Sequence, residues 1–306
     1  MKPIRRVLVA LDLALHGRAL TAGSRLAADH ALALAPALDA PAVVLFHSTV
    51  SDESWDESSQ AYVPVPDGLP APGGAVLEGV LAQFRAAGVT AELAISPEKA
   101  GLGIVRRVLR DGIDLVISGK RNQPDRSGQP LGSVSTKLLR KCPCPVWVVK
   151  PDCDPTPRRI LAATDLTPVG ERVLAFAVFV AEHCDAELHV VHSFQLPLAV
   201  QLEGEPAVAD FVGQQRQERT RKLEAQLAEA NCRRKVEMHV GLTSPTQAIL
   251  ACEERLDPDL VVMGTVSRGG VAGLLVGNTA ERLLGRLDCS LLTVKPDDFV
   301  CPVSLG

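Results

Sequence analysis

The chain repeats itself, and this repeat limits the possible folds more than any other feature of the sequence. "RRVLVALDL" (Arg5–Leu13) returns as "RRILAATDL" (Arg158–Leu166), and "DLVISG" (Asp114–Gly119) returns 145 positions later as "DLVVMG". "CPVWVVKPD" returns as "CSLLTVKPD", again 145 positions later. Such regular self-similarity predicts two tandem domains of the same architecture.

The repeat also sets the domain boundaries. Copy one spans residues 1–150, copy two spans 157–298, and 299–306 form a C-terminal tail. Residues 151–156 are the linker, within the proline-rich and acidic stretch "PDCDPTP", whose stiffness suits a short spacer. Copy one carries eight more residues than copy two, all of them before His47.

Each copy alternates short apolar runs with stretches of helical spacing. In copy one the expected strands are Val7–Leu11, Val43–Phe46, Thr90–Ile95, Leu115–Ser118 and Val146–Val149. The expected helices are Leu20–Leu38, with Pro36 at its end, Gly79–Ala87, Gly103–Arg110 and Val134–Arg140, and residues 49–75 are expected to form a long surface loop. This order predicts an α/β fold in which each domain is a doubly wound parallel sheet with helices on both faces.

Composition narrows the class of protein. Apolar residues make up 46% of the chain, enough for real cores, and the net charge of −4 argues against a nucleic-acid or anionic-membrane partner. The eight cysteines show no paired spacing, which indicates a reduced, cytoplasmic protein. "MKPIRRVLVALDLAL" imitates a signal peptide, but Asp12 interrupts it, so we expect a buried strand and no membrane span.

A ligand of a doubly wound sheet binds beyond the carboxyl ends of its strands, and the loops after the fourth strands fit this place. "GKRNQPDRSGQPLGSVS" and "GTVSRGGVAGLLVGNTA" both read G-x2-(N/S)-x9-G-(S/N), with anchor glycines thirteen positions apart (Gly119–Gly132 and Gly264–Gly277). The second glycine precedes Ser133 or Asn278 at an expected helix start, where free N–H groups favour an anion. Gly-Ser and Gly-Asn are also ordinary helix caps.

These loops, the aspartate after each first strand and the closing strand "CPVWVVK" together resemble the universal stress protein family, whose nucleotide-binding members carry G-x2-G-x9-G-(S/T). The resemblance covers nearly the whole chain as two tandem copies. It implies Rossmann-like five-stranded domains that pair through their last strands. It also implies an adenine nucleotide, ATP or a relative with or without magnesium, between strands one and four of one or both domains.

The resemblance also implies which residues border the nucleotide. In copy one they are Asp12, Ser48, Gly119, Asn122, Gly132, Ser133 and Val134. In copy two they are Asp165, Ser193, Gly264, Ser267, Gly277, Asn278 and Thr279. The second motif glycine is replaced in both copies, and the final Ser or Thr is replaced in copy two. Each copy therefore keeps part of the pattern, and the sequence leaves open which domain binds.

Other polar features have ordinary structural explanations. His47 and His192 match between the copies, but no second histidine or carboxylate stands at metal-ligand spacing, so we expect structural histidines and no metal. Cys144 and Cys289 enter the last strands and are expected to be packed thiols. The run "QQRQERTRK" lies in a helical stretch, and we expect a solvated helix face.

Three functions compete. The first is a nucleotide-binding stress-response or regulatory protein. The second is a structural pseudo-dimer with degenerate sites that acts through protein partners, its domains joined by Val146–Val149 against antiparallel Leu291–Val294. The third is an ATP-pyrophosphatase-like enzyme, but "LDLALHGRAL" after the first strand lacks the Ser/Gly-rich loop such an enzyme needs.

No nucleophile stands beside Asp12 and Asp165 in both copies, so we expect binding and not catalysis. Slow ATP hydrolysis and homodimerisation are left open.

Overall fold

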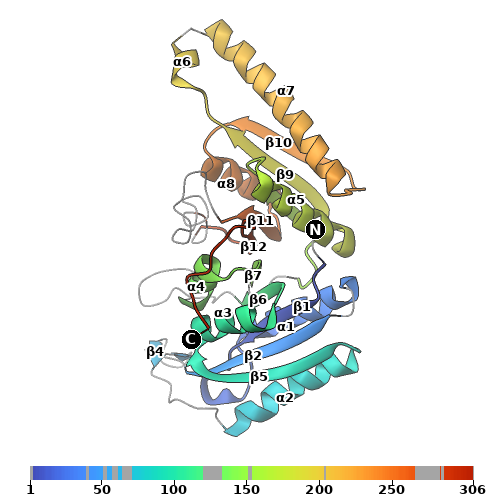
Figure 1. The fold of residues 1–306 in the computed structure, drawn as a ribbon, viewed down its shortest axis with the longest axis vertical. Coiled ribbons are helices and arrows are strands. Elements are labelled where there is room, and N and C mark those ends of the chain that lie inside the picture. Colours follow the sequence, from blue (N-terminus) through green and yellow to red (C-terminus); the bar gives the residue numbers. More distant parts are fainter. Residues whose placement is uncertain are drawn as a thin grey trace.

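One ten-stranded sheet runs through the protein, in the order β10-β9-β8-β11-β12-β7-β6-β1-β2-β5 (Figure 1). The computed structural model describes residues 3–38, 41–50, 54–56, 61–63, 71–119, 133–150, 154–202, 205–265, 283 and 286–305. Each half contributes parallel strands in the chain order third, second, first, fourth, fifth. The expected pair of doubly wound parallel sheets is confirmed.

The element bounds follow the repeat. The first half holds β1 (Arg6–Leu11), α1 (Ala22–Leu34), β2 (Ala42–Val50), α2 (Ala71–Ala86), β5 (Thr90–Lys99), α3 (Ala100–Asp111), β6 (Leu115–Gly119), α4 (Ser133–Lys141) and β7 (Val146–Val149). The second half holds β8 (Arg159–Ala163), α5 (Pro168–Cys184), β9 (Glu187–Phe194), α6 (Leu198–Gln201), α7 (Glu205–Glu229), β10 (Val236–Leu242), α8 (Pro245–Leu256), β11 (Leu260–Gly264) and β12 (Ser290–Val294).

The expectation of a long loop over residues 49–75 is wrong in part. A short antiparallel pair, β3 (Ser54–Asp56) and β4 (Ala61–Val63), lies within it. The following helix, α2, begins at Ala71 and not at Gly79. Pro72 does not prevent this start, because proline in the first helical turn removes an N–H that has no partner there. The other residues of this stretch lie outside the described part of the chain.

Helices cover both faces of the sheet, and the strand residues alternate between two cores. One core combines alternate strand residues with α1, α2, α5 and α7, and the other combines the remaining strand residues with α3, α4 and α8. Both cores continue from the first half into the second. No helix among the described residues is long and apolar enough to cross a membrane.

The same hydrogen bonds hold the first strand in each half and account for the repeated aspartate before each fourth strand. The backbone N–H groups of Arg5 and Arg6 donate to the Asp114 carboxylate at 2.9 and 3.0 Å. Asp259 does the same for the two N–H groups at the start of β8, at 2.8 Å each. Each aspartate precedes the fourth strand of its half, so it ties the first strand to its neighbour in the sheet.

The two halves are joined where their last strands meet. β7 pairs antiparallel with β12, and Leu292 stands opposite Trp147, which is 2% exposed. The expected pairing of Val146–Val149 with Leu291–Val294 is therefore confirmed. Two strands that would each be an open edge cover one another, so the sheet continues from one half into the other. We call this β7–β12 junction the seam.

The segment after β12 crosses back onto the first half. The Lys295 ammonium donates to the Leu139 carbonyl in α4 at 2.6 Å, and this lysine is 1% exposed. Further on, the Cys301 thiol donates to the Lys141 carbonyl at 3.2 Å, and Arg106 of α3 donates to the Ser304 carbonyl at 3.3 Å. The C-terminal segment therefore packs on the domain that it does not belong to (Figure 1).

Deleting residues 289–306 should produce an unstable protein that self-associates, because both the β12 strand and the segment after it are lost and β7 becomes an open edge. Size-exclusion chromatography and thermal unfolding measure this. The matched control is deletion of 299–306 alone, which keeps the seam and should stay monodisperse with a modest loss of stability. A well-behaved monomer from the longer deletion would contradict the role of the seam.

Burial lowers the pKa of Lys295 to about 8 from its usual 10.5. The folded state therefore binds fewer protons than the unfolded state between these values, and stability rises with pH in that window. From pH 7 to pH 9.5, this one group should raise the free energy of unfolding by about 2 kcal/mol. Urea unfolding of wild type and Lys295→Met at both pH values tests it, since the variant should lack this increase.

Candidate functional site

A cavity of about 690 Å³ lies in the second half, at the carboxyl ends of β8, β9 and β11. The start of α5, the start of α8 and one face of α7 complete its described walls. This place is the switch point of the sheet, because the strands that follow β8 run outward to β9 and β10 on one side of it, whereas the β10–β11 crossover returns to its other side. Its volume falls in the usual range of small-molecule sites.

Asp165 stands where β8 passes into α5, and it lines this cavity. One of its carboxylate oxygens accepts from the Thr167 N–H at 3.1 Å and from the Thr167 hydroxyl, so the side chain is held in place. Gly170 follows in the first turn of α5, and a Cβ there would overlap the Thr164 hydroxyl. This packing brings the helix start close to the strand end and leaves a carboxylate at the cavity wall.

The opposite wall carries charge from one face of α7. Gln215, Glu218, Arg219 and Lys222 recur at helical spacing and all line the cavity. The Arg219 guanidinium lies 4.6 Å from the centre of the Phe194 ring, and the Lys222 ammonium is 3.0 Å from the Glu218 carboxylate. The charged run is a solvated helix face, as expected, since the Glu218 and Lys222 side chains are 54% and 60% exposed, but four of its side chains also border the cavity. Their spacing was visible in the sequence, but not the cavity that they face.

The first half is packed differently at the equivalent place. A Cβ added to Gly119, the last residue of β6, would overlap the backbone of Gly23 in the first turn of α1. A Cβ on the equivalent Gly264 would instead meet only a side-chain methyl of Val169, at 2.9 Å. Backbone therefore presses on backbone at the strand end of domain one, whereas domain two places a movable side chain there.

The residues expected to bind nucleotide fall into three groups. Asp165, Ser193 and Gly264 are brought together around the cavity. In the first half, Asp12 directly follows β1, and Gly119 is the last residue of the adjacent strand β6. Ser133 and Val134 are the first two residues of α4. The Ser48 hydroxyl donates to the Glu98 carbonyl at 2.6 Å. The expected residues Asn122, Gly132, Ser267, Gly277, Asn278 and Thr279 lie outside the described residues.

The paired histidines bond the backbone, as expected, and His192 also lines the cavity. His47 Nδ1 lies 3.1 Å from the Leu11 carbonyl, and His192 Nδ1 lies 2.9 Å from the Thr164 carbonyl. Each ring therefore bonds the backbone at the end of the first strand of its own half. The thiols of Cys144 and Cys289 are buried, which confirms that they are packed in the core.

Comparison with known proteins agrees with this architecture. The model of the universal stress protein family matches residues 3–150 and again 156–295. Universal stress protein E of Escherichia coli K12 is 29% identical over 214 residues, which cover 66% of this chain and 67% of that protein.

Two solved structures share the fold along almost the whole chain. A functionally unknown protein of Pseudomonas aeruginosa PAO1 has a TM-score of 0.70 at 24% identity, covering 96% of this chain and 94% of that one. A universal stress protein of Archaeoglobus fulgidus has a TM-score of 0.63 at 20% identity, covering 95% and 98%.

The different packing of the two strand ends can be tested with one substitution in each domain. Gly119→Ala should lower the free energy of unfolding by at least about 2 kcal/mol, since neither backbone can move away without cost. Gly264→Ala should cost less than about 1 kcal/mol, because the Val169 side chain can rotate. Urea unfolding measures both, and equal losses would show that the two ends are packed alike.

Proposed function

Because the chain belongs to the universal stress protein family, with two tandem family domains, we propose that it is a cytoplasmic regulatory protein of the stress response that binds an adenine nucleotide in its second domain. The observation that carries the choice of domain is the cavity of about 690 Å³ beyond β8, β9 and β11. Buried free thiols such as Cys142 and Cys144, 3.5 Å apart, suit the reducing cytoplasm.

The lining chemistry supports a nucleotide. Apolar side chains, among them Ala248, Ile249 and Met263, can cover the faces of a base. The Asp165 carboxylate can accept a hydrogen bond from a ribose hydroxyl. Arg219 and Lys222 can neutralise phosphate oxygens, and the exposed ion pair of Lys222 with Glu218 is weak enough to exchange. A magnesium ion, if one accompanies the nucleotide, would bind between its phosphate groups.

In this proposal the first domain has a structural role. The overlap that any side chain at Gly119 would make with Gly23 favours a domain that completes the sheet and does not open for a ligand. The second candidate function extends this to both domains: a pseudo-dimer that acts through protein partners alone.

Isothermal titration of the whole protein with ATP, with and without magnesium, tests the proposal, together with mass spectrometry of any ligand released on denaturation. Asp165→Ala should weaken binding by about 10- to 100-fold, the cost of one hydrogen bond to a charged group. Its matched control is Asp12→Ala in the first domain, which should bind like wild type. Arg219→Ala should weaken ATP more than adenosine, whereas Arg216→Ala, outside the lining residues, should not.

The outcomes separate the candidates. Absence of heat with every adenine nucleotide, and of any released ligand, would contradict the proposal and leave the pseudo-dimer. Loss of binding in Asp12→Ala with retention in Asp165→Ala would place the site in the first domain and overturn the assignment. Circular dichroism and melting temperature of each variant check that the fold is intact.

A further inference from the structure

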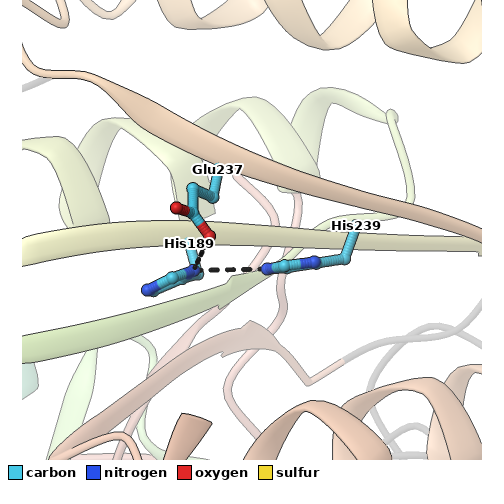
Figure 2. A group of neighbouring side chains, drawn as sticks. All are labelled: His189, Glu237 and His239. Atoms are coloured by element: carbon cyan, nitrogen blue, oxygen red, sulfur yellow. Dashed lines mark hydrogen bonds and ion pairs between the residues drawn. The ribbon is translucent and has the colours of Figure 1, made fainter. Parts of the chain in front are cut away.

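Three potential metal ligands meet on the two outermost strands of the second domain. His189 lies on β9, and Glu237 and His239 lie on the edge strand β10 (Figure 2). The parallel register sets Glu237 directly beside His189 and His239 beside Val191, so all of these side chains leave the same face of the sheet. This is the face that α8 covers.

The separations of the three groups suit one small cation. His189 Nδ1 is 3.2 Å from His239 Nε2 and 3.5 Å from a Glu237 carboxylate oxygen, and the ligand atoms of all three lie within 4.8 Å of one another. Nitrogen and oxygen ligands bind zinc at about 2.0–2.1 Å, so two of them at a tetrahedral angle stand about 3.4 Å apart. The two measured neighbour distances therefore already match those across a tetrahedral ion.

All three atoms can act as metal ligands when the two nitrogens are unprotonated. A single proton on His189 Nδ1 would have to be shared between His239 Nε2 and the Glu237 oxygen. A divalent cation would accept all three at once. The His189 side chain is only 8% exposed, which fixes it, whereas the Glu237 side chain is 59% exposed, so the ion and a fourth ligand such as water can arrive from solvent.

Two neighbouring charges act on the cluster in opposite directions. The Glu187 carboxylate is 3.9 Å from His189 Nε2, where it favours a proton on that nitrogen and leaves Nδ1 free to coordinate. Arg255 on α8 lies 3.0 Å from His239 Nδ1, and it must turn away when His239 Nε2 coordinates, because Nδ1 then carries the proton. Arg255 is exposed and can turn to solvent, but its positive charge opposes the ion.

We propose that His189, Glu237 and His239 form a binding site for a divalent transition-metal ion, with zinc as the matching probe, that ties the edge strand β10 to β9. The two ligands on β10 are two positions apart, a spacing visible in the sequence, but the histidine on β9 is added only by the strand register. The proposal does not depend on nucleotide binding, because His189, Glu237 and His239 are not among the residues that line the cavity.

The first domain supplies a natural comparison. The positions equivalent to His189, Glu237 and His239 are Val44, Glu92 and Ala94, and Val44 pairs with Glu92 in the same register. The glutamate is thus present in both domains, and the two histidines are present in one. A zinc site built as proposed should occur once per chain.

The experiment is zinc titration of chelator-treated full-length protein by calorimetry, with metal content measured after dialysis. Wild type should bind one zinc ion per chain tightly. His189→Gln, His239→Gln and the exposed Glu237→Gln should each lose more affinity than the about 10- to 100-fold that loss of an outer partner costs. Glu92→Gln in the first domain and His183→Gln on the surface of α5 should bind like wild type, and Arg255→Gln should bind several-fold more tightly.

Cobalt substitution identifies the ligands directly. The cobalt protein should show tetrahedral d–d absorption without a thiolate charge-transfer band, and zinc should raise the melting temperature of wild type but not of the His189→Gln variant. Absence of zinc binding, undiminished affinity in the Glu237→Gln and His239→Gln variants, or a thiolate band would each overturn the proposal. If a histidine variant fails to fold, Glu237→Gln and Arg255→Gln decide the matter, because they change exposed side chains and are expected to fold.

Discussion

The antiparallel hydrogen bonding of β7 with β12 is the interaction on which the rest of the structure depends. Each half alone would present its last strand as an open edge, and the pairing turns two five-stranded sheets into one sheet of ten. Both cores continue through the seam, with Trp147 on one side and Leu292 on the other. The buried ammonium of Lys295 and the segment that follows extend the same junction onto α4 and α3.

A shared seam allows the outer parts of the two halves to diverge. Towards the outer edges of the sheet, β9 and β10 carry His189 and His239 where β2 and β5 carry Val44 and Ala94. The ends of the fourth strands diverge too, since α1 presses on Gly119 whereas a cavity opens near Gly264. One domain can then support the other without having to bind the same ligand.

Most of the fold could be predicted from the sequence, for identifiable reasons. All strands of the ten-stranded sheet except its edge strands β5 and β10 are largely buried and read as apolar runs. The repeat reproduces four strands of each half, together with the aspartates that hold the first strands. The start of α2 was predicted too late, because prolines and glycines near Ala71 are typical of loops as well as of first helical turns. The site was predicted less completely, because Arg219 and Lys222 reach it from a helix whose local sequence gives no sign of a cavity.

The sequence by itself determined that the chain has two doubly wound domains, that they resemble universal stress proteins, and roughly where their strands lie, because periodicity and repetition are local properties. The ends of β2 and β5 were not predicted, since they run on to Val50 and Lys99 and not only to Phe46 and Ile95. Only the tertiary structure decided what packs against the end of each fourth strand, the Gly23 backbone in the first half and the Val169 side chain in the second. It alone also brought His189 beside Glu237 and His239, which are 48 and 50 positions away along the chain. Such neighbours are set by strand register and helix packing, and these are fixed only when the whole sheet forms.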